Sequence, residues 1–373
     1  MARNTGKKVR RRGRRRKRGF ATWSIGKKIG AVLGGTLLGV VVIGSVILAS
    51  KMNKLSSVKL DTDKLNISDE VKHEKGYTNV ALFGLDSREK NLGKGNRTDT
   101  IMIASINNET KKVKLVSVYR DTMLKQNGEH YDKANAAYSV GGPETAVNML
   151  NENLDLNIQD YVSVNFLALA DVIDMVDGIT VKLTDEEVVH MNNYCVETSK
   201  VTGKKYKKIE PAVAGTYKLN GVQAVSYARI RYTAGGDYKR TERQRLVLKK
   251  TADKLKQQDL ATLNKIIDKV MPEVSTSFTT KEILSLATGA FDYELGETTG
   301  FPFDLETPEQ IPGYSGSYVI PKGLEENVIK LHQFLYPNKD YTPTATVTDI
   351  SNTLNDMTKV YPNTTESGTS QNE

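Results

Sequence analysis

The feature that most restricts the possible fold is a stretch of 22 residues, 29–50, without one charged side chain. A helix rises about 1.5 Å per residue, so about 20 apolar residues span the hydrocarbon core of a bilayer, which is about 30 Å thick. The stretch is longer than the apolar part of a typical signal peptide, and no clear small-residue cleavage site follows it. We therefore predict one uncleaved membrane-spanning helix, with a cleaved signal peptide as the alternative.

A strongly basic arm precedes this stretch. Residues 1–28 contain thirteen Lys and Arg and neither Asp nor Glu. Positive residues favour the cytoplasmic side, so the arm is expected inside the cell and everything from Lys51 onward outside the membrane. The formal net charge is +9, so removing the thirteen charges of the arm leaves −4 for the remainder. The arm thus fixes topology, with anionic lipid as its next possible partner, and we expect no nucleic-acid partner.

The chain has a single cysteine, Cys195, so an intrachain disulfide is impossible and the fold must depend on core packing. His190 is five residues away, but nothing else in the sequence supports a Cys–His catalytic pair.

Apolar runs of strand length alternate with helical patterns beyond residue 76. We predict strands over residues 79–85, 100–106, 113–119 and 179–183, and helices over 143–154, 166–176, 219–229, 240–257, 260–271 and 324–335. The first strands are apolar on both faces, which is typical of a sheet covered by helices on both sides. The predicted fold class is therefore α/β, with a central mixed β-sheet flanked by helices on both faces and preceded by one transmembrane helix.

The same patterns predict the organisation of the chain. We expect a basic cytoplasmic arm (1–28), a transmembrane helix (29–50), an extracellular stalk (51–76), the main α/β domain (77–258), a continuation of that domain with helices and strands (259–340) and a disordered tail (341–373). The tail is rich in Thr, Asn and Ser and has little apolar periodicity, which is typical of disorder.

Two aspartates flank the first loop of the predicted sheet. Asp86 directly follows the apolar run 80–85, at the carboxyl end of a strand, where open α/β sheets bind ligands. Asp99 comes just before the next strand, so two antiparallel neighbours would bring the two carboxylates face to face. Such a pair repels unless a cation lies between them, and Mg²⁺ (or Mn²⁺) with water and phosphate oxygens fits. The alternative for each is a solvated turn or loop aspartate.

Two arginines belong to the same edge. Arg97 lies two residues before Asp99, so both side chains point to one face if the segment is extended. Arg120 ends the third predicted strand, with the neighbouring Asp121 as its alternative, purely structural ion-pair partner. Carboxylates together with arginines are typical of a metal-assisted phosphate site.

A second cluster of basic residues lies between 229 and 245. Arg229 and Arg231 have a spacing of two, so they would project together from an extended segment, and guanidinium groups bind phosphate oxygens better than lysines do. Arg240 and Gln244 are four residues apart, on one face of the predicted helix. Arg240 is expected in the first helical turn, where a bound anion would offset its conflict with the helix dipole. Arg243 and Arg245 lie off that face and are expected to be solvated.

The chain resembles the LytR–CpsA–Psr family. The resemblance is carried by the basic arm, the single anchor, Gly-Leu-Asp-Ser-Arg at 84–88, Arg-Thr-Asp-Thr at 97–100, Arg-Asp-Thr at 120–122, Arg-Ile-Arg at 229–231 and Asp237 followed by Arg240, Arg243 and Gln244. It covers roughly residues 77–257. It implies a membrane-anchored extracellular enzyme that transfers a glycopolymer, such as teichoic acid or capsule, from a polyprenyl-pyrophosphate carrier to peptidoglycan through a phosphodiester bond.

The resemblance also implies roles for single residues. Asp86 and Asp99 would bind Mg²⁺, and Arg97 would act at the scissile pyrophosphate. The pyrophosphate group would be held by Arg120, Arg229, Arg231, Arg240 and Gln244. The resemblance further implies an apolar pocket for the polyprenyl chain, with the helix faces 166–176 and 246–255 as candidates for its lining. Tyr119 departs from the pattern, because many members carry Pro there, and Lys125 is a candidate second basic contact.

Three other functions are compatible with parts of the sequence. The same site could act as a polyprenyl-pyrophosphate pyrophosphatase, with water as the acceptor. A membrane-bound transcriptional regulator would use the basic arm, but the arginine cluster is expected on the other side of the membrane. A non-catalytic glycan-binding protein would not need the paired aspartates or the arginines, and both are present.

Overall fold

The computed structural model describes residues 56–57, 59–72, 76–85, 92–279, 282 and 293–362. The expected cytoplasmic arm, the expected membrane helix at 29–50 and the candidate ligand Asp86 therefore lie outside the described residues. Within the described stretches, no helix is both long enough and apolar enough to cross a bilayer.

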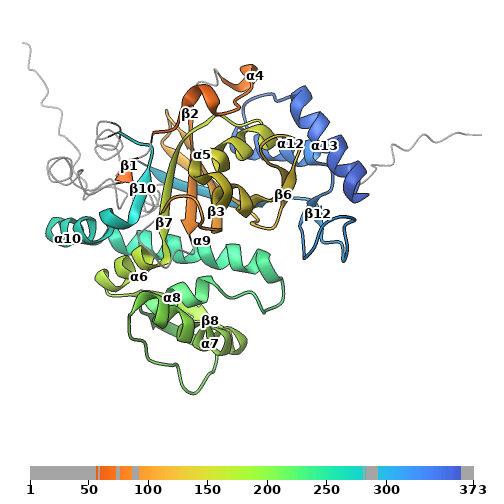
Figure 1. The fold of residues 1–373 in the computed structure, drawn as a ribbon. Helices are drawn as coiled ribbons and strands as arrows, with labels where there is room; N and C mark the ends of the chain where they lie inside the picture. Colours follow the sequence, from red (N-terminus) through yellow and green to blue (C-terminus); the bar gives the residue numbers. More distant parts are fainter. Residues whose placement is uncertain are drawn as a thin grey trace, which may run out of the picture.

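A seven-stranded mixed sheet forms the centre of the molecule (Figure 1). Its strands, in spatial order, are β1 (Ser56–Ser57), β10 (Val274–Thr276), β7 (Ile158–Asn165), β2 (Tyr77–Leu85), β3 (Thr98–Asn107), β4 (Lys112–Val118) and β11 (Glu294–Phe301). The pairs β2–β3, β3–β4 and β10–β7 are antiparallel, whereas β2–β7, β4–β11 and β1–β10 are parallel. The predicted mixed sheet is confirmed.

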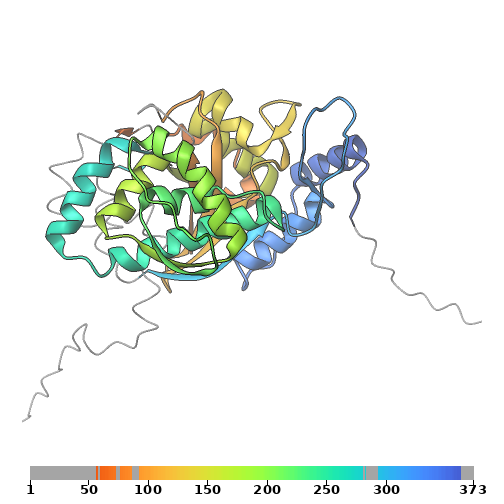
Figure 2. The same cartoon turned by 90° about the horizontal axis from the view of Figure 1, so that it is seen from below.

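Helices cover both faces of this sheet, as Figures 1 and 2 show from two directions. One face packs on α5 (Ala134–Leu154), α12 (Leu324–Leu335) and α13 (Ala345–Thr358). The other packs on α6 (Phe166–Met175), α9 (Gly236–Leu255) and α10 (Leu260–Val270). Alternation along β2 explains the two layers, because Ala81 and Phe83 belong to the first core and Val80 and Leu82 to the second. The prediction of helices on both faces is confirmed.

A smaller lobe packs below the second face. It consists of β8 (Ile179–Leu183) paired with β9 (Gly215–Leu219), together with α7 (Asp185–Thr202) and α8 (Gly221–Ala228), and it has its own core. Thr184 and Asn220 begin α7 and α8 with reciprocal capping boxes, which fix where each helix starts. The lobe thereby places Arg229, directly after α8, beside the start of α9.

Short elements complete the fold. They are η3 (Thr62–Lys64), α4 (Asp69–Lys72), β5 (Met123–Lys125), β6 (Tyr131–Lys133), η4 (Met271–Glu273), β12 (Leu305–Glu306) and β13 (Ile320–Pro321).

The predicted stalk at 51–76 is wrong over its described part. β1 joins the sheet edge beside β10, and Leu65 and Val71 are buried. Leu60 and Ile67 also pack against the core of the first face. The segment is rich in polar residues, but its few apolar side chains are spaced so that they bury against the domain.

The predicted disordered tail is wrong over residues 345–358, which form α13. Val347, Ile350 and Leu354 recur at helical spacing and are buried against the first face. Thr344 caps the helix, and its hydroxyl and backbone N–H both donate to Asp155, which ends α5. The high Thr and Asn content hides a narrow apolar stripe.

Candidate active site

The backbone around Asp99 contains a β-bulge. Gly84 pairs with Thr100 and Leu85 pairs with Thr98, so Asp99 is the extra residue between two paired positions. Bulges are frequent next to active sites, where they change the direction in which a side chain points. A Cβ atom on Gly84 would lie 2.9 Å from the Cβ of Thr100, so glycine permits this close pairing. The antiparallel arrangement predicted for these two strands is confirmed, and position 86 directly follows the paired Leu85.

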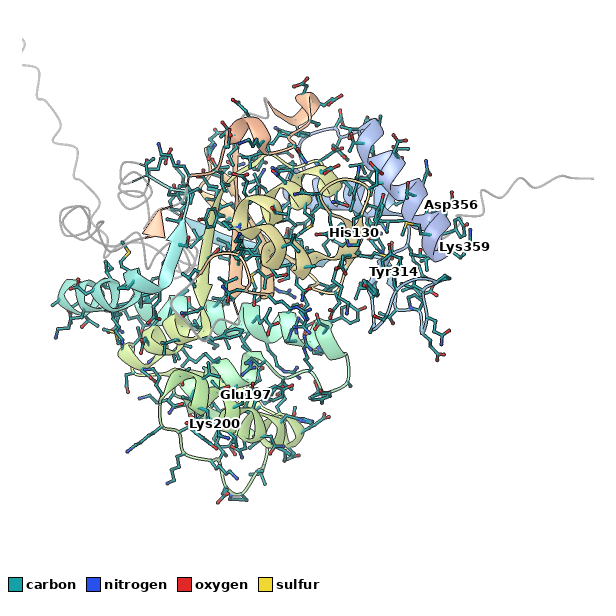
Figure 3. The ribbon with its side chains drawn as sticks, viewed as in Figure 1. His130, Glu197, Lys200, Tyr314, Asp356 and Lys359 are labelled. Atoms are coloured by element: carbon teal, nitrogen blue, oxygen red, sulfur yellow. The ribbon has the colours of Figure 1, made fainter. Side chains whose placement is uncertain are left out.

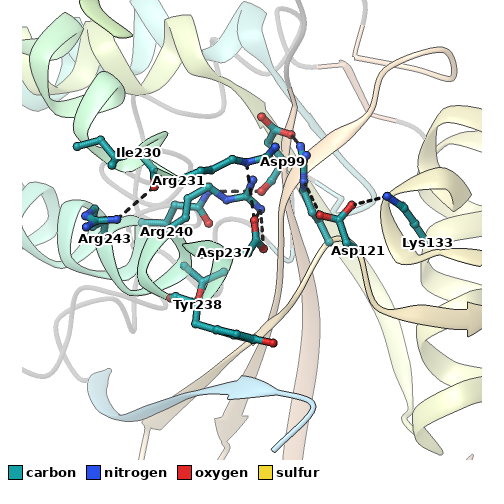
Figure 4. Close-up of polar contacts among 12 residues, drawn as sticks. Asp99, Asp121, Lys133, Ile230, Arg231, Asp237, Tyr238, Arg240 and Arg243 are labelled. Atoms are coloured by element: carbon teal, nitrogen blue, oxygen red, sulfur yellow. Dashed lines mark hydrogen bonds and ion pairs between the residues drawn. The ribbon is translucent and has the colours of Figure 1, made fainter. Parts of the chain in front are cut away.

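Arg120 lies between two carboxylates, directly after β4. Its Nη1 pairs with Asp99 Oδ1, and its Nε pairs with Asp121 Oδ2 at 3.4 Å. Lys133 Nζ lies 3.3 Å from the other oxygen of Asp121 (Figure 4). Burial lowers the pKa of Arg120, but Asp99, Asp121 and Asp237 outweigh that effect and raise it. Arg120 therefore stays charged and links the strand edge to the arginine cluster.

Arg240 is a buried cation with unused hydrogen-bond donors. Arg240 is only 2% exposed, and its Nη2 lies 2.8 Å from one carboxylate oxygen of Asp237 and 3.0 Å from the other. Among the described residues its Nε and Nη1 have no hydrogen-bond partner. Burial lowers the pKa of Arg240, and Asp237 opposes this. A buried N–H donor without an acceptor costs free energy of folding, and a bound ligand with acceptor atoms removes that cost. The geometry around Arg240 therefore suits an anion.

Arg231 approaches the same carboxylate from the loop before α9. Its Nε lies 3.8 Å from Asp237 Oδ1, and its buried Nη2 finds no acceptor within the described part of the chain. Figure 4 shows Arg231 and Arg240 converging on Asp237. Burial raises the pKa of Asp237, with Arg240 opposing that rise. Asp237 therefore acts as the counter-ion that lets two arginines lie together.

Gln244 connects α9 to the bulge. Its Nε2 donates to the backbone carbonyl of Asp99 at 3.4 Å, while its buried Oε1 has no donor partner among the described residues. Both Arg240 and Gln244 are buried on α9, in agreement with the predicted common face. Arg240 is the fifth residue of α9, so its predicted place in the first turn is wrong, and Asp237 occupies that turn.

Arg229 does not project beside Arg231 as predicted. It ends α8 with helical backbone angles (φ −94°, ψ −9°), so the segment is not extended. Its Nη2 pairs with Glu197 at 3.2 Å, on α7 of the lower lobe (Figure 3). The guanidinium also lies 5.6 Å from the ring centroid of Phe166. Arg229 is thereby oriented toward the cavity that Phe166 lines.

Arg243 and Arg245 are not solvated, which corrects the prediction for both. Arg243 is 5% exposed; its Nε lies 2.9 Å from Glu187 Oε1, and it also donates to the backbone oxygen of Ile230. Arg245 Nη1 donates to Ser117 Oγ at 2.8 Å. Arg243 therefore fixes the loop that carries Arg231, and Arg245 fixes α9 on β4.

An apolar cavity of about 70 Å³ adjoins the polar cluster. Four residues of α6 line it, namely Phe166, Ala168, Leu169 and Val172, and α9 contributes Leu248 and Thr251 in addition to Gln244. Gly84, Thr100 and Gln244 line it beside the bulge, and Val270 lines it from α10. The two helix faces proposed as lining therefore do enclose an apolar cavity.

The remaining predicted residues fall as follows. Arg97 is exposed, one residue before β3, and Asp86 lies outside the described residues. Lys125 lies 3.2 Å from Glu152 on α5, so the suggestion of a second basic contact at the site is wrong. No role was predicted for Asp237 or Lys133, although the Gly-Gly-Asp segment at the start of α9 was a usable signal for Asp237.

Comparisons with known proteins identify relatives in sequence and in fold. The Biofilm regulatory protein A of Streptococcus mutans is 32% identical over 220 residues, covering 56% of this chain and 52% of that protein. The polyisoprenyl-teichoic acid–peptidoglycan teichoic acid transferase TagU of Oceanobacillus iheyensis is 31% identical over 195 residues, covering 50% of this chain and 54% of the relative. The chain thus spans about half the length of these relatives.

A solved structure gives the same fold. TagT of Bacillus subtilis with bound octaprenyl pyrophosphate superposes with a TM-score of 0.53 at 22% identity, covering 74% of this chain and 99% of TagT. The model of the LytR_cpsA_psr family matches residues 42–295, which is more than half of the sequence and includes every residue of the site described above. On this match, the chain belongs to the LytR_cpsA_psr family.

Proposed function

We propose that this protein is a phosphotransferase that attaches a glycopolymer, such as teichoic acid or capsule, from a polyprenyl-pyrophosphate carrier to peptidoglycan. The observation that carries the proposal is the buried Arg240, whose Nε and Nη1 have no partner among the described residues. Gln244, on the same helix, lines the apolar cavity. A charged diphosphate attached to an apolar chain matches this combination. The name of the TagU relative and the ligand in the TagT structure support the same substrate class.

The residues have separate tasks in this proposal. Arg231 and Arg240 hold the pyrophosphate through their unused guanidinium N–H donors, and Gln244 adds the second N–H of its Nε2, whose first N–H donates to the backbone oxygen of Asp99. Arg229 lies against Phe166, which lines the apolar cavity. Arg120 and Arg97 neutralise charge at the phosphorus that is attacked. Arg120 is partly buried and held by two carboxylates, and such a fixed charge stabilises a phosphoryl-transfer transition state without rearranging when the reaction occurs.

The proposed reaction exchanges one phosphorus–oxygen bond for another. An acceptor hydroxyl of peptidoglycan attacks the phosphorus that bears the glycopolymer, and the bond to the bridging oxygen of the pyrophosphate breaks. The lipid monophosphate leaves with the electron pair of that bond. Asp99 or Asp86 accepts the proton of the hydroxyl. The product is the phosphodiester between polymer and peptidoglycan.

We also propose that Asp86 and Asp99 bind Mg²⁺ or Mn²⁺. Asp99 supplies a carboxylate with a 17% exposed side chain at the bulge, and Asp86 follows in sequence directly after Leu85, the residue that pairs with Thr98 there. Within the described residues no group of three metal-binding side chains gathers, so water and phosphate oxygens would complete the shell, as is usual for Mg²⁺. When bound, the ion would neutralise phosphate charge. Binding of Mn²⁺, followed by electron paramagnetic resonance, tests this independently of activity and should be lost in Asp99→Asn.

The cellular setting is part of the proposal. The apolar stretch 29–50 would anchor the chain in the cell membrane by a single helix, with its N-terminus inside and the site outside, where lipid carriers present their polymers.

A transfer assay tests the function directly. The purified full chain is mixed with a lipid-pyrophosphate-linked saccharide, uncross-linked peptidoglycan and Mg²⁺, beside Asp99→Ala and a control, Lys218→Ala, at an exposed pair with Asp177. We expect polymer joined to glycan by the native chain and by the control, but not by Asp99→Ala. Release of lipid phosphate without attachment would instead identify a pyrophosphatase. Lipid binding without any turnover would favour the regulatory role suggested by the Streptococcus relative's name.

A further inference from the structure

The attachment of β1 to the sheet restricts where a membrane can lie. Ser56 and Ser57 pair with Ser275 and Thr276 of β10 at the outer edge of the sheet. Six residue steps separate Ser56 from Ser50, the end of the expected membrane helix, and even fully extended they span at most about 22 Å. An anchor ending at Ser50 would therefore hold this edge close to the bilayer.

α10 lies at the same end of the molecule. It leads through η4 directly into β10, which carries β1 on its outer side. Figures 1 and 2 both place α10 and β1 at one end, with α12 and α13 at the opposite end. Asp356 and Lys359 mark that opposite end in Figure 3.

The two ends differ in charge. Residues 249–270 contain six lysines and three aspartates, whereas residues 324–359 contain five carboxylates and three lysines. Lys265 is exposed on α10, and Lys269, with a 54% exposed side chain, reaches Asp171 at 3.2 Å. Lys249, on α9, lies instead beside β11, at the opposite edge of the sheet from β1. A cluster of lysines near a bilayer is attracted to anionic headgroups, and the attraction acts within about 10 Å at 0.1 M salt.

The apolar cavity points to the same end. Its lining extends from Thr100 and Gln244, beside Asp99, to Val270, the last residue of α10. A lipid chain whose head group lies among the arginines would thus run toward α10. A bilayer at that end gives the chain the shortest route between membrane and site.

We infer that the end formed by α10 (Leu260–Val270), with Lys265 and Lys269, is a bilayer-facing surface that binds anionic phospholipid headgroups. This inference rests on the proposed membrane anchor. It adds an orientation that the anchor alone does not fix, because a single helix would also permit a domain that swings freely.

Labels on the full chain in vesicles test the orientation. Ala261→Cys is exposed on α10, and Asn352→Cys is exposed on α13. Cys195 is buried, and burial raises its pKa to about 11, so the native chain serves as the unlabelled control. Each variant carries a fluorophore on its new cysteine, in phosphatidylglycerol–phosphatidylcholine vesicles containing a headgroup spin-labelled lipid. We expect the spin-labelled headgroups to quench the fluorophore at position 261 and to leave the fluorophore at position 352 unquenched.

Adding Lys265→Gln and Lys269→Gln to the Ala261→Cys variant tests the headgroup contact, and adding Lys249→Gln, beside β11, is the matched control. The quenching at 261 should become weaker in the first variant and stay unchanged in the control, and high salt should weaken it in the parent. Equal quenching at 261 and 352, or no change on removing the lysines, would overturn the inference. The transfer assay on the same labelled proteins separates the two proposals: transfer without selective quenching contradicts only the orientation, and selective quenching without transfer contradicts only the enzyme.

Discussion

Arg120, two residues after the end of β4, pairs through its Nη1 with Asp99 on the neighbouring strand β3. Its Nε lies 3.4 Å from a carboxylate oxygen of the next residue, Asp121. The pair lies at the only bulge in the pairing of β2 with β3 across the described residues. One arginine thus holds both the carboxylate proposed for metal binding and the edge of the sheet.

Replacing Arg120 is expected to abolish most transfer. Arg120→Ala removes a fixed charge from the proposed transition state, and losses of this kind reduce turnover roughly 100- to 1000-fold. Arg120→Lys keeps the charge but not the planar fork that contacts two carboxylates, so partial activity should remain. Turnover is measured with saturating lipid-linked saccharide. Native rates in Arg120→Ala would contradict the assigned role.

Asp237→Asn is expected to change both anion affinity and the pH dependence of stability. Burial raises the pKa of Asp237, so its stabilising contribution is complete below the ordinary carboxyl pKa and is lost as pH rises through the raised value. The free energy of unfolding of the native chain, measured with urea, should therefore lose this contribution between acidic and neutral pH. The Asp237→Asn variant should show no such loss. Because Arg231 and Arg240 lose their counter-ion, the variant should also bind inorganic pyrophosphate more tightly at neutral pH. Identical pH profiles would exclude Asp237 as the group responsible.

Filling the apolar cavity is expected to separate lipid binding from phosphate binding. Ala168 is 2% exposed and lines the cavity of about 70 Å³, so Ala168→Phe should occupy that space. Overpacking costs roughly 1–3 kcal/mol, which melting curves can verify. Affinity for a polyprenyl pyrophosphate should fall, while affinity for inorganic pyrophosphate stays near native. The same change at the exposed Ala261 is the matched control, and equal loss of both ligands in Ala168→Phe would argue against a lipid site.

Leu354→Ala should destabilise the whole domain. Leu354 is 1% exposed on α13 and belongs to the core of the first sheet face, where such truncations cost about 2–5 kcal/mol. Asn352→Ala on the same helix is exposed and should change the unfolding free energy by less than about 0.5 kcal/mol. If both variants unfold at the same urea concentration, the tail would not be part of the cooperative fold.

The sequence predicts the parts of the fold whose apolar pattern is complete. The helix at 324–335 and the strand at 179–183 have the predicted bounds, and β2, β3 and β4 differ from prediction by one or two residues. No strand is predicted over Ile158–Asn165, because Asp160 and Ser163 interrupt its apolar pattern. Both polar side chains have distant partners: Asp160 accepts from Ser277, and Ser163 accepts from Tyr138.

Partners that are distant in sequence also limit prediction of the site. The arginines that gather around Asp237 could be found from their spacing, because Asp237, Arg240 and Gln244 lie on one helix. The burial of Arg243 could not, since its partner Glu187 is 56 residues away and in another lobe. Similarly, Arg229 was expected beside Arg231, but Glu197 and Phe166 orient it elsewhere.

The parallel pairing of β1 with β10 has a consequence for the order in which the chain can fold. Ser56 is synthesised early, yet its partner Ser275 is synthesised more than two hundred residues later. β11 and α13, which complete the opposite edge and one face, follow later still. Contacts between such distant segments form slowly, because a long loop must close first. The domain therefore stays incompletely closed until α13 has been synthesised.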